Sequence, residues 1–282
     1  MRKRWKDIIL LLLFLAGVSV LLYPYVAREL NDHNQSIVVE NYRQNASRGG
    51  RETLDAAKKS AEEFNQELYE ENNGKFSTIG ESLDKLYWKE LDFDGDGVMG
   101  YLNIPVIGET LPIRHGTSDE VLQNAAGHLE STSLPVGGEN THCVLTGHRG
   151  LPSSVLFSNL NLMSIGDQIY LHVLGDTLAY EVDKIETLLP EETQSLNVVP
   201  GEDRITLITC TPYGINSHRL LVHARRVPYI AEEEKSTTVL AKTSWTEWVS
   251  FGLLALGAVL ALMIVILVPR HYRRKREGRN KS

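Results

Sequence analysis

The stretch Thr206-Leu207-Ile208-Thr209-Cys210 is an apolar run that ends on a thiol, and Arg219 opens a second apolar run, Leu220-Leu221-Val222. Between them, residues 211–218 contain Pro, Gly and Asn, which favour a reversal of chain direction. Residues directly opposite each other in an antiparallel pair lie about 4.5 to 5.5 Å apart at Cα. The pattern therefore predicts a pair of strands that places Cys210 next to Arg219.

Short apolar runs of this kind continue through residues 100–227 and are separated by turn signals such as Gly137-Gly138. Short helices are expected only at 118–126 and 155–163. Many short strands with few helices indicate an all-β domain, either a closed barrel or a sandwich. The predicted strands are 101–107, 110–114, 141–146, 168–173, 178–188, 205–210 and 219–225.

The preceding segment, residues 28–99, has a different pattern. Apolar side chains recur there at helical spacing until Asn72-Asn73-Gly74 interrupts them. We expect a helical spacer that packs one stripe against the main domain. The stripe consists of Leu54, Ala57, Ala61, Phe64 and Leu68.

Uncharged apolar runs lie near both ends of the chain, at 8–26 and 249–268, and basic residues flank the outer side of each. A membrane-spanning helix needs about 20 such residues, and basic residues favour the cytoplasmic side. The sequence therefore predicts a cell-membrane protein with two transmembrane helices, both termini in the cytoplasm and an extracellular catalytic domain. A cleaved signal peptide is the alternative for the first run.

These patterns together predict six segments. They are a membrane anchor or signal (1–27), a helical spacer with a possible lid region (28–99), a catalytic barrel (100–227), a linker (228–248), a transmembrane helix (249–268) and a basic cytoplasmic tail (269–282).

The formal net charge is −7, although basic residues are concentrated at both ends. The part between the ends is therefore strongly acidic, which argues against nucleic acid as a partner. The only cysteines are Cys143 and Cys210. Cys143 lies inside an apolar run and is interpreted as a small buried hydrophobic residue, whereas Cys210 is the candidate nucleophile.

A cysteine attacks as the thiolate and commonly uses a histidine as its partner. Among nine histidines, His148 is favoured because the glycines around it, in Thr146-Gly147-His148-Arg149-Gly150, let the backbone approach the edge of a site. The rivals His128, His142 and His218 remain open at this point. Arg219 is the candidate donor to the oxyanion that develops during acyl transfer.

A further pattern, Asp92-Phe93-Asp94-Gly95-Asp96-Gly97, has the acidic alternation of the first half of a Ca²⁺ loop. The twelfth position is Asn103 rather than the expected Glu, and a strand is predicted to follow. We therefore interpret the segment as a solvated acidic turn, and we expect no metal and no cofactor.

The strand before Cys210, the position of Arg219 and the stretch Thr146-Gly147-His148-Arg149 resemble the signature of sortases, the cysteine transpeptidases of Gram-positive cell surfaces. The resemblance covers residues 100–227. It implies an eight-stranded β-barrel in which Cys210 is the nucleophile, His148 the acid and base, and Arg219 the oxyanion and substrate donor.

Cys210-Thr211-Pro212-Tyr213-Gly214, residues 127–135 and the second apolar run are most similar to class C, the pilin-polymerising sortases. This resemblance implies cleavage of a Leu-Pro-x-Thr-Gly-like sorting signal between Thr and Gly. The acyl group would then pass from Cys210 to a lysine amine of a pilin subunit. Partners would be surface proteins with that signal, pilin subunits and the cell membrane.

One feature departs from class C, because the sequence contains no Asp-Pro pair of the kind that marks the lid in that class. The lid region corresponds to 72–79, where Phe76 is the single aromatic residue. Two alternatives to pilus assembly stay open. One is a housekeeping-type sortase that joins surface proteins to cell-wall precursor, and the other is a membrane-tethered binding barrel without activity.

Overall fold

The computed structural model describes residues 2–92, 95–234 and 257. Three helices come first: α1 (Arg2–Arg48), α2 (Arg51–Asn72) and α3 (Glu81–Tyr87). Eight strands follow: β1 (Val98–Ile104), β2 (Glu109–His115), β3 (Ala126–His128), β4 (Thr141–Thr146), β5 (Gln168–Val173), β6 (Asp176–Leu188), β7 (Asp203–Thr211) and β8 (His218–Val227). Short helices lie between them: η1 (Pro105–Ile107), α4 (Asp119–Leu122), η2 (Leu160–Leu162) and η3 (Gln194–Leu196).

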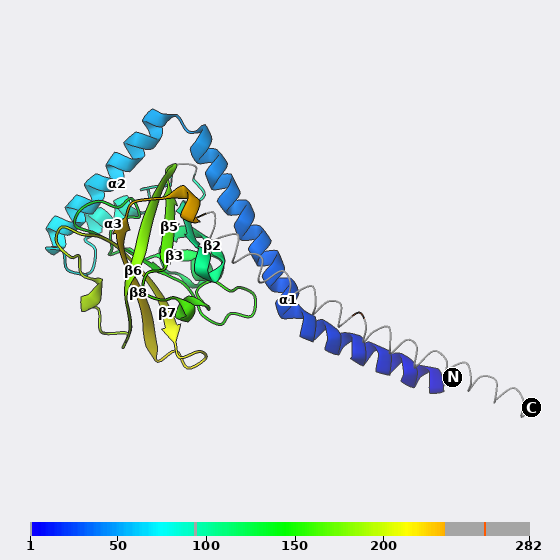
Figure 1. Cartoon of the computed structure of the whole chain (residues 1–282). Helices are drawn as coiled ribbons and strands as arrows, with labels where there is room; N and C mark the ends of the chain where they lie inside the picture. Colours follow the sequence, from blue (N-terminus) through cyan, green and yellow to red (C-terminus); the bar gives the residue numbers. More distant parts are fainter. Residues whose placement is uncertain (1, 93–94, 235–256, 258–282) are drawn as a thin grey trace, which may run out of the picture. The chain divides into compact units, whose positions relative to one another are not determined.

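The strands close into a barrel, drawn in Figure 1. Their order around the barrel is β1-β2-β3-β4-β7-β8-β6-β5. The β2/β3 and β4/β7 pairs are parallel, whereas the other pairs are antiparallel. Inward-facing side chains of all eight strands fill the interior, as with Leu102, Leu145 and Leu207, and β3 contributes Ala126. The predicted closed eight-stranded barrel with short helices is therefore confirmed.

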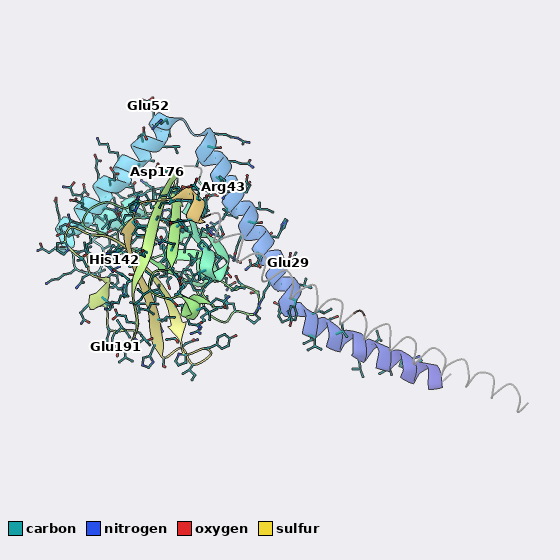
Figure 2. All side chains as sticks on the ribbon, viewed as in Figure 1. Glu29, Arg43, Glu52, His142, Asp176 and Glu191 are labelled. Atoms are coloured by element: carbon teal, nitrogen blue, oxygen red, sulfur yellow. The ribbon has the colours of Figure 1, made fainter. Side chains whose placement is uncertain are left out.

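The spacer is helical as predicted. Helix α2 ends at Asn72, where Asn73 adopts a left-handed conformation with φ 52°. Its apolar stripe lies in the main core, and Ala61, Phe64 and Leu68 are all buried there. An ion pair of 2.6 Å between Lys58 Nζ and Asp176 Oδ2 adds a contact with the start of β6; Asp176 is labelled in Figure 2.

Helix α1 docks on the barrel through its second half. Val39, Tyr42 and Ala46 form a small buried cluster with Val98 and Tyr101 of β1. The Tyr42 hydroxyl donates to Met99 O at 3.0 Å and accepts from Leu174 N at 2.9 Å. These contacts fix one point of a long helix to the barrel wall (Figure 1).

Two predicted helices are wrong in extent. The helix expected at 118–126 ends at Leu122, and Ala126–His128 forms strand β3. A side chain at Gly127 would lie 2.4 Å from Gly116 O, so the missing side chain allows β3 to approach its neighbour. The helix expected at 155–163 is reduced to η2, because Leu156 has a φ of 44°, which no right-handed helix allows.

The predicted localisation, a two-span membrane protein with both termini in the cytoplasm, is contradicted. Within the described part of the chain, no helix has both the length and the apolar character needed to cross a membrane. Helix α1 does not end at residue 27 but continues to Arg48, and its second half docks on the barrel. The second run (249–268) and the basic tail lie outside the described residues, except for Gly257.

Candidate active site

Cys210 lies near the end of β7, and Arg219 lies directly opposite it near the start of β8. The loop between these strands has a cis peptide bond at Thr211-Pro212 and exposes Tyr213 and Ile215. Cys210 is free and partly exposed. The antiparallel pairing predicted from the sequence is therefore observed, and it brings a thiol and a guanidinium to one end of the barrel.

The guanidinium of Arg219 is held by backbone carbonyl groups. Its Nη1 donates to Asn216 O and to His218 O, each at 3.2 Å. Leu188, the last residue of β6, lies opposite Arg219 on the other side of β8. These contacts restrict the side chain and use only one of its nitrogen atoms, Nη1, whereas the planar guanidinium has five N–H donors.

His148 lies beside Cys210 on the side away from Arg219. The parallel pairing of β4 with β7 runs to Thr146 and Ile208, and it continues one step further through Gly147 N donating to Ile208 O at 3.1 Å. Thr209 Oγ1 also donates to Gly147 O at 2.8 Å. Since neighbouring strands are about 4.8 Å apart, the next residue of each chain, His148 and Cys210, are neighbours.

The alternation of side chains places these residues on the same face of the sheet. Leu145 and Leu207 point into the core, whereas Val144, Ile208 and Leu221 belong to a separate cluster outside it. By the two-residue period of a strand, His148, Cys210 and Arg219 share the outer face. The structure thus brings the three predicted site residues together at one end of that face.

Residues 147–158, between the end of β4 and the start of η2, form a loop that is named here the His148 loop. Its two ends are joined by Phe157 N donating to His148 O at 3.2 Å and by Gly150 N donating to Ser158 Oγ at 2.9 Å. These bonds close the loop immediately beside the histidine, so the position of His148 depends on the conformation of the whole loop.

Arg149 is a residue of this site to which the sequence assigned no role. Its Nη1 donates to Thr211 Oγ1 at 3.0 Å and its Nη2 to Asn161 Oδ1 at 2.9 Å. It thereby ties the His148 loop to the residue after Cys210. Its position next to His148 was the only signal in the sequence.

The rivals His128 and His142 are engaged elsewhere. His128 is fully buried, with Nδ1 3.1 Å from the Tyr87 hydroxyl and Nε2 2.9 Å from Ser133 O. His142 has Nδ1 3.0 Å from Asn197 O and Nε2 2.6 Å from Thr206 Oγ1. Burial lowers the pKa of each ring to about 4, so both are neutral structural groups near pH 7.

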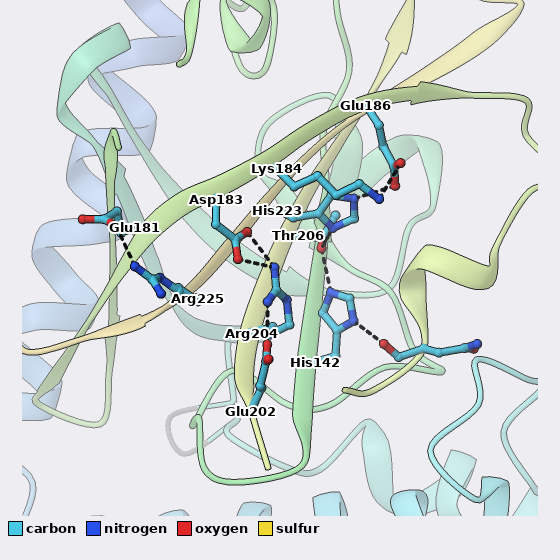
Figure 3. Close-up of polar contacts among 11 residues, drawn as sticks. His142, Glu181, Asp183, Lys184, Glu186, Glu202, Arg204, Thr206, His223 and Arg225 are labelled. Carbon is cyan, nitrogen blue, oxygen red and sulfur yellow. Dashed lines mark hydrogen bonds and ion pairs between the residues drawn. The ribbon is translucent and has the colours of Figure 1, made fainter. Parts of the chain in front are cut away.

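The bonds of His142 extend into a polar chain on the outer face (Figure 3). Thr206 Oγ1 is 2.7 Å from His223 Nδ1, and His223 Nε2 is 3.0 Å from Glu186 Oε1. Burial acts to raise the pKa of Glu186, but hydrogen bonds from Lys184 and His223 together lower it below its usual value. These hydrogen bonds link β4, β7, β8 and β6 with Asn197, the residue that follows η3, and they do not include Cys210.

The remaining rival, His218, lies opposite Thr211 at the start of β8, with Nδ1 2.9 Å from Ser217 Oγ. It is thus one pair beyond Cys210 and Arg219. The other cysteine, Cys143, is free and buried in the core, as the sequence predicted. Burial raises the pKa of its thiol far above the usual range, so it is not a candidate nucleophile.

The predicted lid region packs against the β6–β7 connection. Phe76 N donates to Asn197 Oδ1 and Val198 N donates to Gly74 O, both at 2.8 Å. The Phe76 ring packs on the outer cluster of Val144, Leu196 and Leu221. This segment therefore covers part of the outer face that also carries Cys210.

The predicted acidic turn is described only in part, since residues 93–94 lie outside the described residues. Asp92 Oδ1 accepts from Gly97 N, and Asp96 Oδ1 accepts from Val98 N. In the described part of the chain, no three His, Cys, Asp or Glu side chains are grouped so that they could hold a metal ion. The absence of a metal or cofactor requirement stays a prediction.

The barrel is similar to those of solved structures. Sortase C1 of Streptococcus agalactiae is 41% identical, with a TM-score of 0.66, over 68% of this chain and 99% of that one. Sortase C of Streptococcus pneumoniae is 44% identical, with a TM-score of 0.62, over 69% of this chain and 98% of that one. The chain belongs to the sortase family. The sortase domain matches residues 102–227, and the predicted similarity to class C sortases is confirmed.

Curated sortases of other types are also similar. Sortase A of Streptococcus agalactiae serotype III is 31% identical over 130 residues, and sortase D of Bacillus subtilis is 29% identical over 131 residues. The matched region spans 52% and 63% of these two relatives. Since sortases are cysteine transpeptidases, the predicted enzyme class is confirmed for the family to which the chain belongs.

Proposed function

We propose that this sortase cleaves a Leu-Pro-x-Thr-Gly-like sorting signal between Thr and Gly and transfers the acyl group to a lysine amine of a pilin subunit. The observation that carries this proposal is the position of Cys210 between Arg219 and His148 at one end of the outer face. The similarity to class C sortases supports pilin as the substrate class, since the Streptococcus pneumoniae sortase C structure was described in relation to pilin substrate specificity.

In the first half-reaction, the Cys210 thiolate attacks the carbonyl carbon of the substrate Thr. The negative charge that develops on the carbonyl oxygen is stabilised by the Arg219 guanidinium, which is fixed by its bonds to two backbone carbonyl groups. His148 donates a proton to the Gly nitrogen as the C–N bond breaks. The products are a thioester on Cys210 and a peptide with a free Gly amine.

In the second half-reaction, a lysine amine attacks the thioester carbonyl. His148, now neutral, takes a proton from that amine, and the C–S bond breaks to regenerate the Cys210 thiolate. The new bond is an isopeptide bond. One proton leaves His148 and one returns to it, so the cycle needs no external acid or base.

The test is to incubate the full-length protein with a sorting-signal peptide and either a pilin domain or a cell-wall precursor amine, and to identify products by mass spectrometry. An isopeptide product with the pilin lysine supports the proposal. Transfer only to the cell-wall precursor would replace pilus assembly by surface-protein anchoring. Absence of peptide cleavage under all conditions would overturn the proposed activity.

A further inference from the structure

Helix α1 touches the His148 loop at two points. Arg28 Nε donates to Pro152 O at 3.3 Å, and Gln35 Nε2 donates to Ser154 Oγ at 3.3 Å. Gln35 is 6% exposed and Ser154 is 1% exposed, although Ser154 lies in a loop. Loops usually run over the surface. The burial of Ser154 and its bond to Gln35 indicate that α1 covers this part of the loop.

The contact residues of α1 are spaced along one face. Arg28, Gln35 and Tyr42 are separated by seven residues each, which places them on the same stripe of a helix. Tyr42 fixes the helix to Met99 O and Leu174 N on the barrel wall, while Gln35 lies about 10 Å along the axis. One helix therefore joins the barrel wall to the His148 loop.

The residue type at position 35 is informative. A purely apolar stripe would place Leu or Ile there, since burying an amide without a hydrogen bond is costly. The amide of Gln35 is instead matched to the hydroxyl of Ser154. This hydrogen bond favours one position of α1 along the His148 loop, because its two partners must meet. Apolar packing alone would tolerate a shift of the helix along the loop.

The backbone of the His148 loop connects Ser154 to His148, so the contact with α1 also restrains His148. Ser154 lies between Gly150 and Phe157, and Phe157 N bonds to His148 O while Gly150 N bonds to Ser158 Oγ. We propose that Gln35 and Ser154 are positioning residues through which helix α1 holds the His148 imidazole in register with Cys210. This inference rests on the proposed function, in which His148 carries the proton.

The test uses the full-length protein with Gln35→Leu, which removes the amide donor at similar volume, Ser154→Ala, and the double variant. A small displacement of an acid–base group can cost up to about 100-fold in rate. We expect kcat to fall about 10- to 100-fold in each single variant, with KM for the sorting peptide nearly unchanged and the pH profile of kcat/KM altered. The double variant should be no worse than the worse single variant, because the two residues act through one contact.

Tyr42→Phe is the matched control. It removes a buried hydroxyl from the same stripe of α1 but touches the barrel wall rather than the His148 loop. We expect it to lower stability and to leave the pH profile as in the wild type. If it alters the profile as Gln35→Leu does, general loosening of α1 explains the effect and the positioning role is overturned.

A second readout needs no substrate. The rate at which iodoacetamide alkylates Cys210, located by mass spectrometry, follows the thiolate fraction as pH is varied. Gln35→Leu and Ser154→Ala should change this pH dependence in the same direction as His148→Ala. If Gln35→Leu does not fold, Ser154→Ala decides the matter alone.

The outcomes separate the two proposals. Gln35-dependent alkylation in a protein that cleaves no sorting peptide would overturn the proposed function and keep the positioning role. Normal cleavage by the wild type, with unchanged kcat, pH profile and alkylation in Gln35→Leu and Ser154→Ala, would overturn the positioning role and keep the function.

Discussion

Arg219 lies directly opposite Cys210 in the antiparallel pair of β7 and β8, and two backbone carbonyl groups at the end of the intervening loop hold its guanidinium. This relationship places the residue that carries the cation directly opposite the residue that carries the thiol. It also explains why the residue type matters, since Lys has a point charge on a flexible stem and Arg has a planar, forked donor set.

We therefore expect Arg219→Lys to lower kcat about 100- to 1000-fold, the usual cost of losing one oxyanion donor. Peptide cleavage kinetics measure this directly. Arg225→Lys is the control, because Arg225 lies on the same strand but forms only a largely exposed ion pair with Glu181; it should stay near wild type. Near-normal turnover of Arg219→Lys would show that Arg219 is a bystander.

Cys210→Ala should abolish both cleavage and transfer while the protein keeps its fold, since Cys210 is partly exposed and contributes little packing. Cys143→Ala should instead lower stability and leave the activity unchanged. Its side chain is buried in the core, so we expect a loss of about 1 kcal/mol in unfolding free energy with activity retained. Peptide cleavage and urea unfolding of both variants distinguish the two thiols, and residual transpeptidation by Cys210→Ala would refute the assignment.

The glycine before His148 is predicted to be sterically required. A Cβ at Gly147 would lie 2.8 Å from Phe157 Cδ2 and 2.9 Å from Phe157 Cγ, and Phe157 is fully buried. Gly147→Ala should therefore cost about 1 to 3 kcal/mol of stability through overpacking and lower kcat by displacing the His148 loop.

Adding Phe157→Leu to Gly147→Ala should restore part of the activity, because a smaller side chain makes room for the methyl group. Gly50→Ala is the control, since the nearest atom to its added Cβ would be 3.8 Å away. Equal activity of Gly147→Ala and the wild type would contradict the predicted contact.

Acidification should destabilise the barrel between about pH 6.5 and pH 4. Burial lowers the pKa of His128 and His142 to about 4 from the ordinary value of 6.5. In this range the unfolded chain binds protons at both rings and the folded chain does not, so the unfolding free energy falls as pH falls. The loss should be on the order of 2 to 3 kcal/mol per histidine by pH 4.

Urea unfolding at several pH values measures this effect, and His128→Gln and His142→Gln should each make the pH dependence shallower. The comparison with these variants is needed because Glu109 acts in the opposite direction. Burial raises the pKa of its carboxyl to about 8 from the ordinary value of 4.5. Between these two values the folded chain binds a proton at Glu109 and the unfolded chain does not, so this group increases the unfolding free energy as pH falls. An unchanged slope in both histidine variants would refute the predicted role of the two rings.

Local pattern in the sequence was sufficient for several elements. The apolar spacing before Asn72 predicted α2, and alternating apolar runs predicted seven of the eight strands, with boundaries shifted by up to three residues. It also predicted the β7–β8 pair, because strands joined by a short loop pair with each other for local reasons. The assignment of catalytic roles to His148, Cys210 and Arg219, and the segment boundaries, stay predictions.

Strand β3 could not be predicted from pattern alone. Its three residues include Gly127, which has no side chain to alternate and is selected by the close approach of Gly116 O. Such a requirement comes from a neighbouring strand rather than from the segment itself. The helix predicted there followed local propensity, and tertiary contact overrode it.

What the sequence by itself determined was helix α2, seven of the eight strands and the adjacency of Cys210 and Arg219, because spacing and turn residues act within a few positions of each other. Only the tertiary structure decided that β4 runs parallel to β7, which brings His148 beside Cys210 from about 60 residues away. It also decided that Gln35 of α1 covers the His148 loop. Both contacts join segments that are far apart in the sequence and meet only when the barrel closes and α1 packs on it. No local pattern in the sequence specifies which distant segments meet.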